Sequence, residues 1–157
     1  MAWHQIEIRL KPRPRGLHLV TDEVVGALPL LKQMKVGLLH VFIQHTSASL
    51  SLNENADPDV RADMQRWLDR AVPETAPYFE HTTEGPDDMP AHPKSGPLWT
   101  ELTIPARHGR LRLGTWRAVY LAEHSHPGGA RWGAGWGVGC RVVCGGRGGR
   151  FGGGWPG

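Results

Sequence analysis

The stretch that decides the fold runs from Val36 to Val60 and reads VGLLHVFIQHTSASLSLNENADPDV. Its first part, 36–43, is apolar and largely β-branched or aromatic apart from His40, which predicts a strand covered on both faces. From Gln44 onward, hydrogen-bonding side chains replace most of the apolar ones. Such groups need partners, either one another or a ligand, because an unpaired polar group is costly to bury. A capped strand end would satisfy them locally, but a block this dense favours a functional site.

The length and cysteine content indicate one intracellular domain. A chain of 157 residues is long enough to bury a sizeable core without covalent staples. The only two cysteines, Cys140 and Cys144, imply no disulfide framework, so a cytoplasmic location is expected. The chain has no signal-peptide pattern and no apolar run of membrane-spanning length, so neither a signal peptide nor a membrane partner is expected.

The basic balance of the chain comes from its C-terminal end. Residues 130–157 hold four arginines and no acid, which leaves 14 basic and 15 acidic side chains in residues 1–129. The main part of the chain therefore lacks the charge signature of a nucleic-acid-binding domain.

The residues before the deciding stretch predict two strands and a helix. Apolar residues alternate over 3–10, which predicts a half-buried strand, and 17–20 predicts a second strand that forms a hairpin with the first. A helix with an N-cap at its start is expected over 21–34, where Pro29 would kink the axis.

A second helix is predicted directly after the polar block. Asp57 and Pro58 form an N-cap and first-turn proline pair, and apolar residues recur at helical spacing to about Val72. The free amides at this helix start would favour an anionic ligand. Residues 73–97 then show no structural period, which predicts a long loop. This loop carries groups that bind metals, protons or phosphate: His81, Glu84, Asp87, Asp88, His92 and Lys94.

The remaining residues complete a β-rich pattern. Strands are predicted over 99–104, 110–113 and 115–122, with a turn at 105–109. The fold class is therefore α+β, a β-rich single domain of about seven strands in a mixed or antiparallel sheet with two helices.

Several separated blocks resemble the YjbQ family of secondary thiamine-phosphate synthases. They are QHTSASLSLNENADPDV at 44–60, EGPDDMPAHPKS at 84–95 and HGRLRLGTWRAVYLAEH at 108–124, and GLHLVTDEV at 16–24 fits the family's beginning. The similarity covers residues 1–131. It implies a compact fold that assembles as a homotrimer, with polar sites near subunit contacts. It also implies an activity, the joining of a pyrimidine diphosphate to a thiazole phosphate with release of pyrophosphate.

The resemblance also implies where the site residues lie. His45, Lys94 and Glu123 are the expected catalytic residues of a site for a phosphorylated small molecule. The residues expected to bind the substrate are Thr46, Ser47, Asn53, Asn55, Arg110 and Thr115. Lys94 and Arg110 would stabilise the leaving pyrophosphate as cations.

A divalent metal, zinc or magnesium, is a possible cofactor under this interpretation. Neutral imidazoles suit zinc, and His45, His81 and His92 are the candidate ligands, with Glu123 or His124 as a further ligand or orienting partner. Magnesium would instead suit Asp87, Asp88 or Asp57. Asp57 has an alternative role as a helix cap, and Asp87 and Asp88 could belong to a solvated turn. A trimer that binds metal or a small ligand without catalysis is the alternative function.

The end of the chain departs from the family pattern. Residues 132–157 are rich in glycine, arginine and tryptophan and show neither a strand nor a helix period, which predicts a tail separate from the 1–131 domain. One hypothesis is a reading-frame slip near Arg131 that replaces a terminal strand. A remote alternative is RNA binding, because GGRGGRFGGG at 145–154 resembles RGG-type segments.

Overall fold

The computed structural model describes residues 2–126 and 138–146, with side chains from residue 4 to residue 126. The elements along the chain are the strands β1 (Ala2–Leu10) and β2 (Gly16–Leu19), helix α1 (Thr21–Gly26), the 3₁₀ helix η1 (Pro29–Gln33), strands β3 (Val36–Ile43) and β4 (Ala48–Glu54), helices α2 (Pro58–Ala71) and α3 (Asp88–Ser95), and strands β5 (Glu101–Arg107), β6 (Arg110–Leu111), β7 (Arg117–Glu123) and β8 (Val138–Gly146). The predicted α+β class is confirmed.

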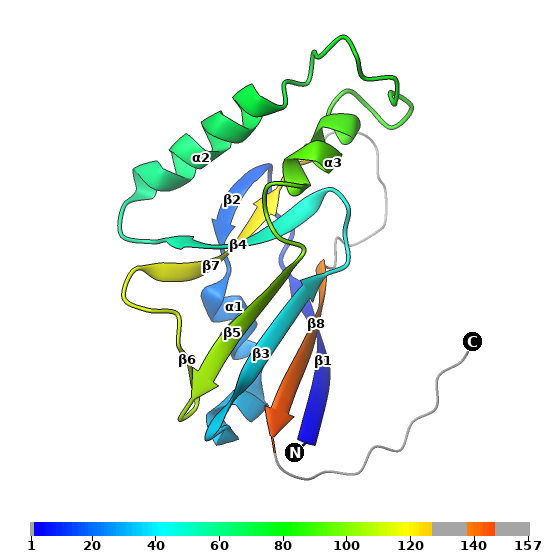
Figure 1. The fold of residues 1–157 in the computed structure, drawn as a ribbon. Coiled ribbons are helices and arrows are strands. Elements are labelled where there is room, and N and C mark those ends of the chain that lie inside the picture. Colours follow the sequence, from blue (N-terminus) through cyan, green and yellow to red (C-terminus); the bar gives the residue numbers. More distant parts are fainter. Residues whose placement is uncertain (1, 127–137, 147–157) are drawn as a thin grey trace, which may run out of the picture.

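The strands form two antiparallel sheets (Figure 1). One has five strands in the order β1-β8-β3-β5-β6, and the other has three in the order β2-β7-β4. The predicted hairpin of the first two strands is wrong, because β1 pairs with β8 in one sheet while β2 pairs with β7 in the other. The turn between them, rich in proline and arginine, therefore carries the chain from one sheet to the next.

A single main core fills the space between the two sheets. Ile8, Val41 and Ile104 from the five-stranded sheet belong to the same buried cluster as Leu50 and Val119 from the three-stranded sheet. Residues in and next to α1 and η1 complete this cluster: Val24, Leu28, Leu31 and Met34. The predicted helix over 21–34 is thus split in two, because Pro29 has no N–H for a continued α-helix and instead begins η1.

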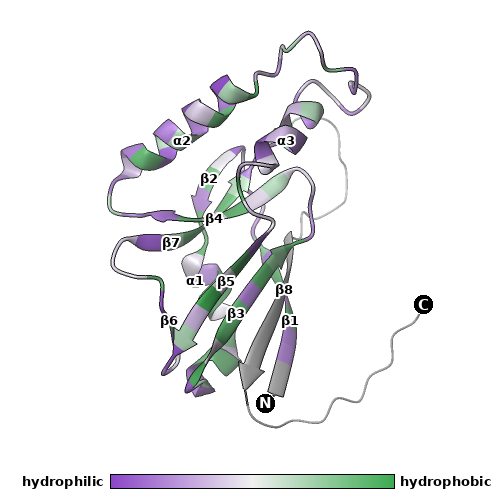
Figure 2. Ribbon diagram, viewed as in Figure 1, coloured by the Kyte–Doolittle hydropathy of each residue, from purple (hydrophilic) through white to green (hydrophobic). Residues whose placement is uncertain are grey.

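Within one chain, strand β3 is covered on one face only, so the prediction of a strand buried on both faces is wrong for the single chain. Leu39, Val41 and Ile43 point into the core, whereas Val36, Leu38 and Phe42 on the other face are 71%, 49% and 38% exposed. In Figure 2 this strand is nevertheless mostly hydrophobic along its length. The larger sheet therefore presents an apolar stripe along the outer face of β3.

Helix α2 has the predicted start. The carboxylate of Asp57 accepts a hydrogen bond from the Asp59 N–H at 2.8 Å, and Pro58 occupies the first turn, where its missing N–H costs nothing. Of the apolar stripe, Leu68 is fully buried, whereas Trp67 is 55% exposed.

The segment predicted as one long loop contains α3, so that prediction is wrong for residues 88–95. Pro93 lies inside this helix, and Pro90 lies in its first turn, where no N–H is needed. A short helix can tolerate Pro93 because only one intrahelical hydrogen bond is lost. In Figure 1, α2 and α3 lie at the same end of the molecule, beyond the three-stranded sheet.

Strand β5 also runs through its proline, where a turn was expected. Pro105 pairs with Leu38 of β3, and its carbonyl accepts the Arg112 N–H at 2.7 Å on the opposite side. In an antiparallel strand the N–H and C=O of one residue point the same way, so the missing N–H faces this short outer edge and removes no bond to β3. The turn falls at His108 and Gly109, which both have positive φ angles.

Residues 138–146 form a strand although their sequence shows no strand period. Strand β8 lies between β1 and β3 and pairs with both. Its pairing is made by the backbone, which needs no alternation of side chains. Residues 132–137 and 147–157 of the predicted tail, with the arginines of the RGG-like segment, lie outside the described residues. The boundary at residue 131 and the frame-slip hypothesis stay predictions.

Among the described residues, no helix has the length and apolar character needed to cross a membrane.

Candidate functional site

Two histidines and an aspartate converge at the start of α3. Asp88 and His92 lie one helical turn apart and therefore face the same side, and His81 reaches them from the preceding loop. The Nε2 atoms of His81 and His92 lie 3.0 and 3.4 Å from the same Asp88 oxygen, Oδ2. Glu84 adds a second carboxylate, 3.2 Å from the His81 Nε2.

The electrostatics of this cluster favour the ionised form of Asp88 and the charged form of His81. Hydrogen bonds with Asp88, then Glu84, raise the pKa of His81. Burial by itself would raise the pKa of Asp88, but its contacts with Glu84, His81 and His92 lower it overall. A divalent cation satisfies the same charge requirement as a protonated imidazole.

The donor set fits a metal such as zinc. One ligand atom from each of His81, Asp88 and His92 lies within 4.8 Å of the other two. Two imidazoles and one carboxylate form the protein ligand set of several open zinc sites, in which a water or substrate completes the coordination. Since Asp88 is largely buried, its charge requires such partners.

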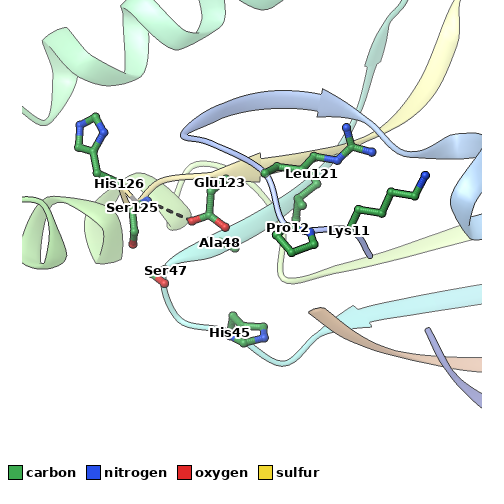
Figure 3. A pocket seen from close by; sticks show the side chains of 10 residues that line it. Lys11, Pro12, His45, Ser47, Ala48, Leu121, Glu123, Ser125 and His126 are labelled. Atoms are coloured by element: carbon green, nitrogen blue, oxygen red, sulfur yellow. Dashed lines mark hydrogen bonds between the residues drawn. The ribbon is translucent and has the colours of Figure 1, made fainter. Parts of the chain in front are cut away.

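His45 lies in the connection between β3 and β4 and lines two neighbouring hollows. One is an open pocket of about 580 Å³ that it shares with Thr46, His92, Ser95 and Thr100. The other is a narrow recess, shown in Figure 3, which it shares with Ser47 and Glu123. His45 therefore stands between the α3 cluster and the end of β7.

Glu123 is the carboxylate of the narrow recess. It ends β7 and accepts a hydrogen bond from the Ser125 N–H at 3.1 Å. Burial raises the pKa of Glu123, although this hydrogen bond and the charge of His45 act in the opposite direction. In Figure 3 its carboxyl group projects into the space between His45 and Pro12. A raised pKa favours the protonated form of this carboxyl group compared with a solvated glutamate.

Lys94 lies beneath the site rather than in it. It is 1% exposed, and its Nζ donates to Asp69 Oδ1 of α2 at 2.8 Å. Burial lowers the pKa of Lys94, whereas the hydrogen bond with Asp69 raises it. Arg15 bonds to the same aspartate and to Glu74, and the Nε2 of His126 lies 2.8 Å from Arg15. This set, which we call the Lys94 network, joins α2, α3, β2 and the end of β7.

A buried histidine lies near the same network. His124 is 1% exposed, and its Nε2 lies 2.8 Å from the buried Ser49 Oγ. Its Nδ1 is buried without a hydrogen-bond partner in the described part of the chain. Burial first, and then the charges of Lys94 and Arg15, lower the pKa of His124 to about 4. The histidine is therefore neutral in the folded protein at physiological pH.

Comparison with known proteins agrees with this fold and with these motifs. A family model described as "UPF0047 protein YjbQ-like" matches residues 4–132. The chain belongs to the YjbQ family. It is 53% identical over 129 residues to the UPF0047 protein YjbQ of Salmonella typhimurium, covering 82% of this chain and 93% of that protein. A UPF0047 protein of Synechocystis is 43% identical over 121 residues, covering 77% of this chain and 82% of that protein.

Solved structures share the fold. A conserved hypothetical protein of Thermus thermophilus superposes with a TM-score of 0.64 at 32% identity, covering 89% of this chain and 95% of that one. A YjbQ/UPF0047 family protein of Clostridium acetobutylicum gives a TM-score of 0.64 at 27% identity, with the same coverage. Membership in the YjbQ family fixes the fold and assigns no reaction.

The structure of this YjbQ-family chain divides the predicted site residues into groups. His45, Thr46, Ser47, His92 and Glu123 lie around the two neighbouring hollows. His81 joins His92 in the α3 cluster, whose carboxylate, Asp88, had been expected only as a magnesium ligand or turn residue. Lys94 is 1% exposed and is not among the described residues that line either hollow.

The other predicted substrate-binding residues lie elsewhere. Asn53 and Asn55 follow at the far end of β4, roughly 20 Å from Ser47 at about 3.3 Å per residue. There the Asn55 Oδ1 accepts from the Tyr120 hydroxyl at 3.0 Å, and Asn53 lines a separate pocket with Trp116. Arg110 pairs with Arg107, which in turn pairs with the start of β3, at the end opposite to His45. The start of α2, expected beside the site, lies at the Asn55 end.

Several residues around the hollows were missed by sequence reasoning. Lys11 and Arg13 line the narrow recess from the turn after β1, and His126 lines it from beyond β7. The turn after β1 alternates cationic residues with prolines over 11–15, a pattern that is typical of an ordinary surface turn. Only the pairing of β2 with β7 brings this turn beside Glu123, because Gly16 lies opposite Glu123 in the register.

We predict that His124 makes the stability of this protein decrease in mild acid. Its pKa is lowered from 6.5 to about 4 by folding, so unfolding takes up a proton between these values. Above pH 6.5 His124 is neutral in both the folded and the unfolded state and does not reduce stability. As the pH falls from 6.5 toward 4, its protonation in the unfolded state lowers the free energy of unfolding by on the order of 3 kcal/mol. Urea unfolding of wild type and His124→Gln at several pH values measures this. The variant should lose less stability on acidification, and parallel curves would contradict the prediction.

Proposed function

We propose that the protein catalyses a metal-assisted group transfer between phosphorylated small molecules, and that this reaction is thiamine-phosphate synthesis, as the family resemblance implies. The observation that carries the proposal is the convergence of His81, Asp88 and His92 beside an open pocket that also contains His45. The open pocket, about 580 Å³, has room for a small-molecule ligand. The narrow recess next to it, which His45 also lines, offers a second region in which a ligand could bind. A reaction that joins two molecules needs two adjacent binding regions.

The departure of pyrophosphate sets the main chemical demand. As the bond between the pyrimidine methylene carbon and the diphosphate oxygen breaks, its electron pair goes to the oxygen, and negative charge grows there. A divalent metal held by His81, Asp88 and His92 would neutralise that charge as a Lewis acid. His92 would belong both to this ligand set and to the wall of the open pocket, which would place the metal at the pocket rim.

The roles of the chain's own residues follow from their positions. His45 can donate or accept a hydrogen bond in either hollow and thus orient both substrates toward one another. Glu123 can hold a proton at its carboxyl oxygen. Lys94 was expected to act catalytically; because it is 1% exposed and pairs with Asp69, we propose instead that it supports α3.

The alternative function is a protein that binds metal or a small ligand without catalysis. The same three groups at α3 support it equally, since a metal site does not by itself imply a reaction. Metal binding and biological activity are therefore tested separately.

We predict that the purified protein binds about one zinc ion per chain at the α3 cluster. After treatment with a chelator and reloading, calorimetric titration should show binding that His81→Ala and His92→Ala weaken by roughly 100-fold. His18→Ala is the matched control, because His18 lies on β2 and bonds to the Pro14 carbonyl. Wild-type protein without measurable zinc affinity, or equal losses in all three variants, would remove the metal from the proposal.

We predict that the gene restores growth of a bacterial strain lacking its thiamine-phosphate synthase when thiamine is omitted. His92→Ala and His45→Ala should fail to restore growth, because each removes a group from the open pocket. Lys35→Ala should restore it, since Lys35 is exposed and precedes β3 at the end away from His45. If the wild-type gene fails while the protein binds zinc, the non-catalytic function is favoured.

We propose a homotrimer, as the resemblance implies, formed in part through the outer face of β3. Val36, Leu38 and Phe42 give this face an apolar stripe that one chain leaves in contact with water. Light scattering should give a mass of three times 17.3 kDa. Leu38→Asp should shift the protein toward the monomer because it places a charge in the contact, whereas Asp63→Asn, an exposed change on α2, should not. A monomeric wild type would contradict the assembly.

A further inference from the structure

The narrow recess is built from three segments that are far apart in the sequence. Lys11, Pro12 and Arg13 come from the turn after β1, His45 and Ser47 from the β3–β4 connection, and Glu123 and Ser125 from the end of β7. Figure 3 shows Lys11 and Pro12 on one side of Glu123, with His126 on the other side and His45 below. Lys11 lies outside the sequence motifs that carry the family resemblance.

The turn that carries Lys11 is fixed in place. Glu23 of α1 accepts the Lys11 backbone N–H at 3.1 Å through one carboxylate oxygen and the Arg13 guanidinium through the other. Both oxygens of Glu23 are thereby engaged with the turn. Within residues 4–126, the Lys11 ammonium has no ion pair of its own, so no carboxylate of that range neutralises its charge.

The remaining charges around the recess are consistent with an anionic ligand. Arg13, which is paired with Glu23, and the imidazoles of His45 and His126 also line the recess, and Glu123 is the one carboxylate among its described lining residues. Burial raises the pKa of Glu123, which favours its uncharged form compared with a solvated glutamate. An uncharged carboxyl group can donate a hydrogen bond to an anionic oxygen instead of repelling it.

The size of the recess limits what it can hold. Its volume is about 50 Å³, which corresponds to roughly three to five water molecules at about 10–15 Å³ each. That is the room needed by one tetrahedral anion, not by a complete substrate. The floor is apolar, formed by Ala48 and Leu121, and this low-polarity surrounding strengthens the attraction between a bound anion and nearby cations.

We propose that this recess binds the phosphate group of a small phosphate ester through Lys11, and that the rest of the ligand passes His45 into the open pocket beside His92. His45 lines both hollows, so it is the point at which such a ligand would cross from one to the other. The inference rests on the proposed function for the reaction that this ester enters, while the binding of the anion stands by itself. Lys11 thereby becomes a substrate-binding residue, and the α3 cluster is left for the second substrate and its leaving group.

The test is phosphate binding by metal-free protein. Inorganic phosphate is titrated into chelator-treated protein, and binding is followed by the broadening of the ³¹P resonance and by calorimetry. Wild type should bind phosphate, Lys11→Gln should weaken that binding at least tenfold, and Lys11→Arg should retain it. Lys35→Gln makes the same charge change at an exposed lysine far from the recess and should bind as wild type does. Because Lys11 is exposed, its variants are expected to fold normally.

The outcomes separate this inference from the proposed function. Equal phosphate binding by wild type and Lys11→Gln would overturn it, as would binding that requires zinc and is lost in His92→Ala, because the anion would then sit at the α3 cluster. Failure of growth rescue with Lys11-dependent phosphate binding intact would count against thiamine-phosphate synthesis alone. If Lys11→Gln loses phosphate binding and the wild-type gene restores growth, both the phosphate site and thiamine-phosphate synthesis are supported.

Discussion

The contact between Lys94 and Asp69 is the constraint on which the candidate site depends. A fully buried ammonium group would cost several kcal/mol without a partner, so α3 must sit where Asp69 of α2 can receive its hydrogen bond. Arg15 and Glu74 extend the same set of charges to β2 and to the loop after α2. The His126 N–H then donates to Asp87 at 2.6 Å and ties the end of β7 to the beginning of α3. His92 and Asp88 are carried on the short helix that these bonds locate.

The arrangement explains why two hollows with different chemistry lie side by side. The open pocket is bordered by the helix that the Lys94 network holds, and the narrow recess is bordered by strand ends and the turn after β1. Imidazole and carboxylate groups that could hold a metal lie beside the first, and Lys11 and Arg13 line the second. His45 belongs to a connection between the two sheets, which is why a single side chain can serve both.

Much of the fold could be predicted from the sequence, because alternation and capping are local signals. The strand over β1, the Asp57 cap and the helix over α2 all depend on residues within a few positions of one another. The pairing of β1 with β8 and of β2 with β7 depends on which sheet each strand joins, and neighbouring strands in the sequence gave the wrong answer. Helix α3 was missed because it is only eight residues long and contains two prolines, so its sequence shows no clear helical period.

The candidate site was only partly predictable for the same reason. His45, His92 and Glu123 stand in motifs with conspicuous chemistry, and the structure brings all three to adjacent hollows. Asn53 and Asn55 belong to the same dense polar block as Ser47, yet an extended strand separates its two ends. The continuous run of polar residues therefore predicted one site, but the extended strand β4 places its two ends in separate parts of the molecule. Lys11 gave no signal at all, since its position beside Glu123 arises from the register of strands that are remote in the sequence.

The place of β8 in the larger sheet bears on how the chain folds during its synthesis. Residue 2 pairs with residue 146, so the ladder that joins β1 to the rest of the sheet closes across nearly the whole length of the polypeptide. Until the ribosome has released that last strand, β1 and one side of β3 expose unpaired amides and carbonyls. Contacts of such long range form slowly, and the nascent chain passes through a period in which its strand edges can recruit other chains. Chaperones that shield exposed backbone during translation would therefore act on this protein mainly before its C-terminal residues emerge.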